Sequence, residues 1–491
     1  MLGEQREEWS SRVSYILAAM SMAVGTGNIW RFPRMVAENG GGSFLIGWAI
    51  FLFLWSFPLV MLEMAMGRKT RMGTLGSFRE FIGQKYTWMG AVIAWVTISI
   101  TFYYSVLVGW TYKYAVLALS GTFNNKGLDT NLLYKTFTAD ATQTITFHFL
   151  AIVSTGIIVY FGVKKGIERA SSILLPALII LLIVAVVKSL SLEGAMGGVA
   201  YMFTPDWSYL TKANTWLEAL SQSAWSVGAG WGLYATYAIY TREKEDIAQN
   251  TFTAGFGNNS VELLAGLAII PAVFALAPSP EYMHEAMSSG NYGLTFVYMA
   301  QLFTQMTGGL FMSIIFFVAL AFAAVTTLIA MVELVTRILM DFGIERRKAI
   351  VWVVAVCFVM GIPSAISIDF LGNQDWVWGI GLLVGCMFYA IAAAKYGIEK
   401  IAKEEIDAVS DIKVAKYWMF TIKYCVPVIF VAFLSWWAYQ SIIWYPDTWW
   451  NPKEIFGLGT IVVQVAFAVL VTRALNNWFN KKIKSPSDVL K

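Results

Sequence analysis

Hydrophobic residues along the chain gather into long stretches that alternate with short polar or charged segments. Each stretch has about 20 residues or more, enough for a helix to cross roughly 30 Å of hydrocarbon, and none shows the two-residue alternation of a membrane barrel. The pattern predicts an all-α polytopic membrane protein whose twelve transmembrane helices cover residues 12–36, 43–67, 88–120, 146–163, 170–190, 214–240, 248–277, 307–340, 349–367, 376–396, 417–443 and 455–478.

The short loops between these spans predict the orientation. Twelve spans put both ends of the chain on one side, and that side carries the clustered basic residues Arg68, Lys69, Arg71, Arg79, Lys85, Lys164, Lys165, Arg169, Arg346, Arg347, Lys348, Lys481, Lys482 and Lys484. By the positive-inside rule we expect both termini to be cytoplasmic in a multi-pass protein of the plasma or bacterial inner membrane. The first residues, MLGEQREEWSSR, lack the features of a removable signal peptide, so we expect the first span to be retained.

Composition narrows the function. Hydrophobic residues make up 58% of the chain and charged residues 13%, and the net charge of +4 is explained by the basic loops, so no nucleic-acid partner is expected. The three cysteines have no CxxC spacing, and His148 and His284 stand alone, so we expect neither a transition-metal centre nor an enzyme. A channel would need a continuous polar lining or repeated filter loops, which the sequence lacks.

Two spans are interrupted by glycines in a matching way. "AVGTGN" at 23–28 and "SVGAGW" at 226–231 both carry Val-Gly-x-Gly in mid-span. The first copy lies in span 1 and the second in span 6, so the second copy begins five spans after the first. An odd number makes the second set enter the membrane with reversed orientation, as in inverted repeats whose broken helices form transporter binding sites. The alternative is close helix packing, but packing glycines prefer four-residue spacing, whereas two-residue spacing suits unwinding.

A broken helix supplies its own binding chemistry. Unwinding frees backbone N–H groups at the start of the outer half-helix and C=O groups at the end of the inner one. The freed amides suit a carboxylate, and the freed carbonyls suit a small hard cation.

Six blocks of the sequence resemble the neurotransmitter:sodium symporters, whose best-known bacterial member is a leucine transporter. They are Trp9-x-x-Arg12, AVGTGNIWRFP at 23–33, ENGGG at 38–42, PLVMLEMAMGR at 58–68, KGIERA at 165–170 and YTREKEDI at 240–247, and the resemblance runs from about residue 6 to residue 480. It implies a 5+5 inverted repeat, with unwound helices 1 and 6, and two additional C-terminal helices. The expected units are a cytoplasmic segment (1–11), two repeats (12–190 and 214–396), helices 11 and 12 (417–478) and a cytoplasmic tail (479–491).

The resemblance also implies sodium-coupled uptake of an amino acid or related amine, with two sodium sites. The first site would use the Ala23 carbonyl, the side chains of Asn28, Ser226 and Asn258, and the carboxylate of the substrate. The second would use the carbonyls of Ser21, Val24 and Ala323 with the hydroxyls of Thr326 and Thr327. Neutral oxygen donors of this kind suit an alkali cation, although the two threonines could instead bond back to the preceding helical turn.

One position indicates the substrate class. Monoamine transporters of the family carry an aspartate where this chain has Gly25, so Gly25 implies a substrate that brings its own carboxylate. That carboxylate would meet the amides near Thr26 and Gly27 and the Tyr104 hydroxyl, and the amine would meet carbonyls around Ala23, Trp225 and Ser226. The side chain would face Ile100, Tyr104, Gly228, Trp231, Thr327 and Met331, so we expect a neutral, hydrophobic amino acid, large aliphatic or aromatic.

The resemblance implies two gates. Arg31 and Asp375, the latter at the start of span 10, would close over the substrate from outside, above Trp225 and Tyr104. Arg6 and Asp341 would pair on the cytoplasmic side, near Trp9 and Tyr240. Gly166 and Pro176 match a family pattern for unwinding span 5, the alternative being an ordinary helix start followed by a membrane proline.

Carboxylates within the spans have separate expected roles. Glu262 lies one turn beyond Asn258, where chloride-dependent relatives have serine, so we expect it to replace chloride and to release a proton on the return step. Glu63 is expected to accept hydrogen bonds from unwound backbone, and Glu333 stands where the leucine transporter has glutamine. The alternative function is a proton-driven broken-helix transporter, which should lack the combination of Arg31, Asn28 and Asn258.

Overall fold

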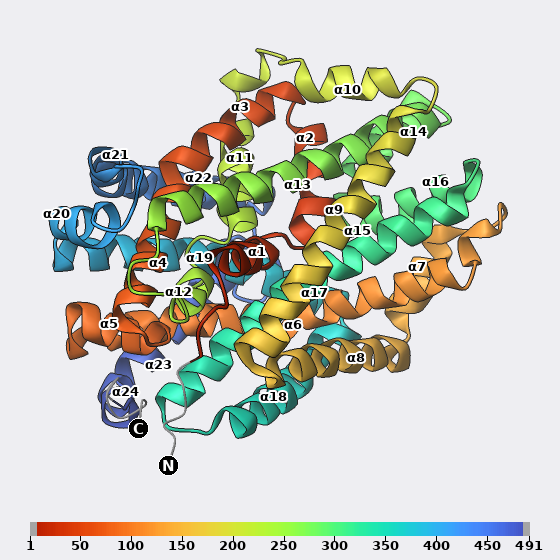
Figure 1. Cartoon of the computed structure of the whole chain (residues 1–491). Helices are drawn as coiled ribbons and strands as arrows, with labels where there is room; N and C mark the ends of the chain where they lie inside the picture. The colour runs from red at the N-terminus through yellow and green to blue at the C-terminus, as the bar shows by residue number, and fades with distance from the viewer. Residues whose placement is uncertain (1–6, 485–491) are drawn as a thin grey trace.

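The computed structural model describes residues 7–484, and these form a bundle of helices (Figure 1). The predicted spans correspond to α1 (Arg12–Ala23) with α2 (Phe32–Glu38), α3 (Gly42–Phe51) with α4 (Phe57–Thr70), α6 (Thr87–Leu119), α8 (Ala141–Tyr160), α9 (Arg169–Leu190), α11 (Ala213–Val227) with α12 (Leu233–Ala238), α13 (Ile247–Leu276), α17 (Gly309–Asp341), α18 (Arg346–Ile366), α19 (Ile368–Tyr396), α21 (Ala415–Phe420) with α22 (Val426–Trp444), and α23 (Leu458–Ala474) with α24 (Asn476–Lys482).

Within the described chain, nine helical stretches are long and apolar enough to cross a membrane, and two bent pairs bring the number to eleven. The one predicted span outside these eleven is span 6 (214–240), which consists of α11 and α12; these are separated by Gly228–Gly232 and are individually short. The all-α membrane fold and the breaks in spans 1 and 6 are therefore confirmed, while the limits of the five structural units stay predictions.

Span boundaries were least accurate where a helix begins with polar residues. Helix α19 starts at Ile368, with Ser367 accepting a hydrogen bond from the Phe370 N–H at 3.2 Å, so Asp375 lies inside the helix and not at its start. Helix α8 similarly begins at Ala141 behind the cap Asp140. Shorter helices fill the predicted loops: α5 (Thr74–Ile82), α7 (Thr130–Ala139), α10 (Ala195–Phe203), α14 (Pro280–Ser288), α15 (Gly290–Tyr292), α16 (Ala300–Gln305) and α20 (Ile398–Lys400).

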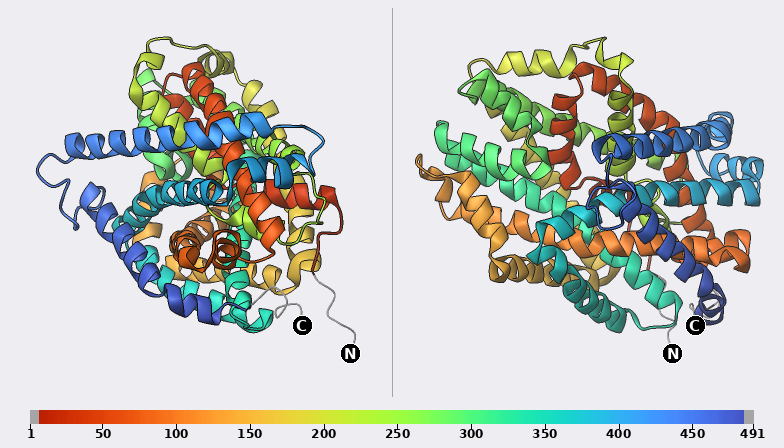
Figure 2. Two further views of the ribbon diagram at one scale, coloured as in Figure 1. Left: turned by 90° about the vertical axis from the view of Figure 1, so that its left-hand side faces the viewer. Right: turned by 180° about the vertical axis from the view of Figure 1, so that it is seen from behind.

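Helices α6 and α17 form the centre of the bundle. They pack along each other, and α8, α9, α18 and α19 pack around them. Helix α1 lies near the middle of the molecule against α13, α9 and α17 (Figure 1), while α11 packs on α3 and α12 on α4. The late helices α22 and α23 lie on the outside of the bundle (Figure 2). The two broken spans are thus held between long, continuous helices.

The first and last described segments lie on the same side of the molecule. The Glu7 carboxylate pairs with Arg346 at 3.5 Å, and the Lys484 N–H donates to the Asp341 carbonyl at 2.9 Å. Both partners flank the short connection between α17 and α18. This agrees with an even number of membrane crossings.

Span 5 is continuous in this structure. Gly166 lies in a π-helical segment (Val163–Glu168), and α9 runs through Pro176 to Leu190 without a break. A Cβ at Gly166 would lie 2.0 Å from the Ile158 carbonyl oxygen, so this glycine permits close packing on α8. The expected unwinding of span 5 is not present in this conformation.

Candidate functional site

The break in span 1 lies where the sequence predicts it. Helix α1 ends at Ala23, Val24 is extended, and a π-helical segment (Gly27–Arg31) leads into α2 after a bend of 56°. The Gly25 N–H donates to the Asn28 side-chain oxygen at 2.9 Å. A Cβ on Gly25 would lie 2.8 Å from the Thr327 hydroxyl and 3.2 Å from the Tyr104 hydroxyl, so only glycine fits there without a shift.

The break in span 6 is made by three glycines with left-handed backbone. Gly228, Gly230 and Gly232 have φ of 81°, 87° and 79°, values that side-chain-bearing residues rarely adopt. The Gly230 N–H donates to the buried Glu63 carboxylate at 2.5 Å, which confirms the role expected of Glu63. Unwound backbone inside the bundle is thus satisfied by a carboxylate from α4.

A cavity of about 350 Å³ lies between the two breaks. Of the residues expected at the substrate, it is lined by Ala23, Gly25, Thr26, Gly27, Tyr104, Trp225, Ser226, Gly228, Trp231 and Thr327. Ile100 and Met331 are fully buried and do not line it, although each lies one helical turn from a residue that does, Tyr104 on α6 and Thr327 on α17. The wall instead includes Leu107, Ile380 and Leu383, which the sequence did not identify.

The side chains expected at the first sodium site meet in one buried cluster. The Asn28 amide donates to the Asn258 side-chain oxygen at 2.8 Å and lies 3.3 Å from the Ser226 hydroxyl, which also accepts from the Asn258 amide at 2.7 Å. All three residues are at least 94% buried. Their contacting oxygens are neutral, a donor set that fits an alkali cation better than a transition metal.

The second expected sodium site joins the break in span 1 to α17. The Thr327 hydroxyl donates to the Met22 carbonyl at 3.1 Å, and the Thr326 hydroxyl lies 3.3 Å from the Val24 carbonyl. Thr326 also donates back to the Ala323 carbonyl at 2.9 Å, so the back-bonding alternative and the convergence on α1 occur together. Ser21 is buried here, and its hydroxyl has no partner in the described chain.

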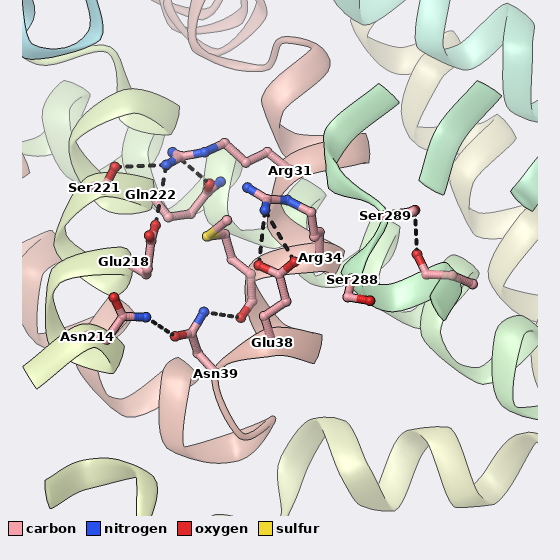
Figure 3. A network of polar contacts seen from close by, with 12 residues as sticks. Arg31, Arg34, Glu38, Asn39, Asn214, Glu218, Ser221, Gln222, Ser288 and Ser289 are labelled. Atoms are coloured by element: carbon pink, nitrogen blue, oxygen red, sulfur yellow. Dashed lines mark hydrogen bonds and ion pairs between the residues drawn. The ribbon is translucent and has the colours of Figure 1, made fainter. Parts of the chain in front are cut away.

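Arg31 and Asp375 line the same cavity but do not pair with each other. Arg31 donates to the Ser221 hydroxyl at 2.8 Å and to the Gln222 side-chain oxygen at 3.2 Å, and it lies 3.7 Å from the Glu218 carboxylate (Figure 3). Asp375 accepts a hydrogen bond from the Tyr103 hydroxyl at 3.0 Å. Trp225 and Trp231 meet edge to face, with ring centroids 5.4 Å apart, in the cavity wall.

On the side of the chain termini, Trp9 is hydrogen-bonded to α12 and to the residues that follow it. Its backbone N–H donates to the Tyr240 carbonyl at 3.1 Å and its indole N–H to the Tyr237 carbonyl at 3.0 Å. Asp341 pairs with Arg337 at 3.0 Å and accepts from the Gly73 N–H at 2.7 Å. Arg6, its expected partner, lies outside the described residues.

Glu262 and Glu333 are both fully buried but differ in their partners. Glu262 accepts from the Trp48 indole N–H at 2.8 Å and from the Gln222 amide, close to the first expected sodium site. Glu333 forms a two-point pair with Arg346, at 2.9 and 2.6 Å, and accepts from the Tyr240 hydroxyl at 2.5 Å. Glu333 therefore has an internal countercharge that the sequence did not indicate.

Two broken helices that face one cavity inside a membrane bundle define a multi-pass substrate transporter. The model of the sodium:neurotransmitter symporter family matches residues 6–146 and 137–481, and the chain belongs to this family.

Two relatives and one solved structure support this family assignment. An uncharacterized sodium-dependent transporter of Methanocaldococcus jannaschii is 30% identical to this chain, over 87% of this chain and 89% of the relative. YhdH, an uncharacterized sodium-dependent transporter of Bacillus subtilis, is also 30% identical, over 80% of this chain and 84% of the relative. The crystal structure of MhsT in complex with L-phenylalanine superposes with a TM-score of 0.76 at 29% identity, over 87% of this chain and 99% of that one. The protein is thus a sodium-dependent symporter, and its relatives are transporters.

Proposed function

We propose that the protein imports a neutral, hydrophobic L-amino acid, large aliphatic or aromatic, together with sodium and without chloride. The observation that carries this proposal is the break at Gly25, where a Cβ would already contact Thr327 and Tyr104 and no acidic side chain fits. An amine without a carboxylate would find no anionic partner at this position. The related MhsT structure contains L-phenylalanine, a substrate of the proposed class.

The main-chain groups of the substrate meet the break in span 1. Its carboxylate binds the amides near Thr26 and Gly27, where the Tyr104 hydroxyl lies 3.4 Å from the Thr26 N–H. Its amine meets the carbonyls around Ala23, Trp225 and Ser226, at the C-terminal ends of α1 and α11. The partial negative charge of these two helix ends matches the ammonium group of an amino acid.

The substrate side chain lies against an apolar wall. Trp231, Leu107, Ile380 and Leu383 supply large hydrophobic surfaces. At Gly228 a Cβ would meet nothing closer than the edge of Tyr234 at 3.9 Å, so this position leaves room for a bulky substrate. The combination favours large aliphatic and aromatic side chains over small or charged ones.

Two sodium ions accompany the substrate. The first binds at Asn28, Ser226, Asn258, the Ala23 carbonyl and the substrate carboxylate, and the second at Thr326, Thr327 and the carbonyls of Ser21, Val24 and Ala323. Since the substrate completes the first ion shell, each ligand raises the affinity for the other, as coupled binding requires. The buried Glu262 carboxylate supplies the negative charge near the first ion that chloride supplies in relatives with serine, and it releases a proton on the return step.

Transport follows alternating access. Sodium stabilises the form in which the cavity is open between Arg31 and Asp375, substrate binding closes this gate, and release of Trp9 from Tyr237 and Tyr240 opens the side that carries the termini. The basic loops on that side support a cytoplasmic location for it. Each ligand shifts the equilibrium only by its difference in affinity for the two forms.

Uptake into proteoliposomes tests the proposal. With an imposed inward sodium gradient we expect accumulation of at least one large neutral amino acid, competition by others of its class, and none by charged amino acids or by aromatic amines that lack a carboxylate. Accumulation that persists without sodium contradicts the coupling, and a strict chloride requirement contradicts the role of Glu262.

A further inference from the structure

Arg31 rests in a cradle formed by one face of α11. Its partners Glu218, Ser221 and Gln222 are spaced i, i+3 and i+4, which puts all three on the same side of the helix. Figure 3 shows the guanidinium reaching across from span 1 to these three side chains. We call Glu218, Ser221 and Gln222 the α11 cradle.

On the opposite side of the cavity, the Asp375 carboxylate has a hydrogen-bond partner of its own. Asp375 of α19 accepts its hydrogen bond from Tyr103 of α6, and no ion pair within 4 Å joins Asp375 to Arg31 in the described structure. Each half of the gate therefore has partners on its own side while the cavity lies between them. An open gate in which Arg31 lacked an acidic neighbour would leave a guanidinium only 18% exposed without a countercharge.

We propose that Glu218 is a second partner of the gate arginine, and that the α11 cradle holds Arg31 away from Asp375 while the cavity is open. Closing the gate transfers Arg31 from the Glu218 carboxylate to the Asp375 carboxylate. Glu218 then sets the balance between the open and closed forms. The inference rests on the proposed function in one respect, the assignment of Arg31 and Asp375 as the outer gate.

An exchange between two carboxylates suits a gate energetically. Removing a partly buried charge from its only countercharge is costly, whereas exchanging one carboxylate for another keeps the guanidinium paired in both forms. The Arg31–Glu218 pair is partly exposed, at 18% and 25%, so its contribution is small. Pairs of this kind contribute about 0.2 to 1 kcal/mol, so loss of Glu218 should change the ratio of open to closed forms about 1.5- to 5-fold.

Glu218 gives a cleaner test than its neighbour in the cradle, because Gln222 also donates to Glu262. Leu383 lines the cavity about two turns deeper along α19 than Asp375, so a cysteine there reports on opening of the gate. The experiment uses the Leu383→Cys protein, with Cys425→Ser to remove the one native cysteine that is not fully buried. The protein is reconstituted in sodium without amino acid and treated from outside with a membrane-impermeant thiol reagent.

We expect Glu218→Gln to lower the reaction rate about 1.5- to 5-fold, because Arg31 shifts toward Asp375. Asp375→Asn should change the rate in the opposite direction, because Arg31 then has only the cradle. Glu38→Gln is the matched control: it removes a carboxylate from the same polar network, but its partner is Arg34, at 3.0 Å (Figure 3). Its rate should equal that of the parent protein.

An unchanged or faster reaction in Glu218→Gln overturns the proposal, as does an equal slowing by Glu38→Gln, which would indicate a general charge effect. Effects of opposite sign in the Glu218 and Asp375 variants cannot come from misfolding. Because the thiol reaction needs no substrate, the two proposals can fail separately. Failure of amino-acid uptake by the protein with its native Leu383 and Cys425 would contradict the proposed substrate and leave the cradle supported.

Discussion

Asn28 and Asn258 are 230 positions apart in the chain, yet the amide of one donates to the side-chain oxygen of the other at 2.8 Å. The contact joins the break of span 1 to the middle of α13, and Ser226 adds the break of span 6. A cluster of neutral oxygens drawn from three helices, two of them broken, fits the first proposed sodium site, where an ion would couple the positions of those helices.

Replacing Asn258 by alanine should weaken sodium binding. A hydrogen-bonding or ligating contact to a charged group is worth about 1.5–3 kcal/mol, so the sodium concentration for half-maximal uptake should rise about 10- to 100-fold. Uptake measured over a range of sodium concentrations gives the answer. Asn373→Ala is the control, since Asn373 is hydrogen-bonded to Ile455 and Thr460 away from the cavity. A sodium dependence equal to that of the parent would exclude Asn258 from the site.

Gly25 should tolerate no side chain. In Gly25→Ala the new methyl group lies 2.8 Å from the Thr327 hydroxyl and forces it to move, and Thr327 belongs to both the substrate wall and the second proposed sodium site. Overpacking of this kind costs about 1–3 kcal/mol, so substrate and sodium affinities should both fall about 5- to 100-fold. Binding of labelled amino acid at several sodium concentrations measures both effects. Gly127→Ala, whose Cβ would meet only Asn125 at 3.6 Å, should bind like the parent.

Glu262→Ser should make transport depend on chloride. The carboxylate is fully buried, bonded to Trp48 and Gln222, and its removal takes a negative charge away from the first proposed sodium site. A chloride ion in the space left by the shorter side chain would restore that charge. We expect uptake by the variant to fall at least 10-fold in gluconate buffer and to recover in chloride, while the parent is indifferent to the anion. Recovery in neither buffer would refute the assignment.

The sequence predicted the two breaks because glycines spaced two apart inside an apolar span have few other uses. The resemblance of the motif around Asn28 also predicted that Asn28, Ser226 and Asn258 come together, and the structure brings them together; their role as sodium ligands stays a prediction. The sequence did not predict Leu107, Ile380 and Leu383 in the wall, because the rotation of a helix that is apolar all round cannot be read from its residues. Ile100 and Met331 stay predictions, since they lie one turn from the lining residues Tyr104 and Thr327. The i, i+3, i+4 spacing of Glu218, Ser221 and Gln222 was visible, but only the fold brings Arg31 to it.

Glu333 and Arg346 form a buried ion pair that could not be read from the sequence either, because only the fold brings the two side chains together. Arg346→Gln leaves the fully buried Glu333 without its countercharge, and breaking such a pair costs about 3–5 kcal/mol. Glu333→Gln should cost less, because Arg346 keeps the Val159 carbonyl at 3.1 Å and Glu7 at 3.5 Å. The double variant should recover most of the loss, since two neutral amides need no countercharge. Thermal unfolding of the purified protein in detergent ranks the four proteins, and Lys403→Gln, which breaks an exposed pair with Glu399, should unfold like the parent. A double variant no more stable than Arg346→Gln would show that Arg346 stabilises the α17–α18 connection by contacts other than the charge of Glu333.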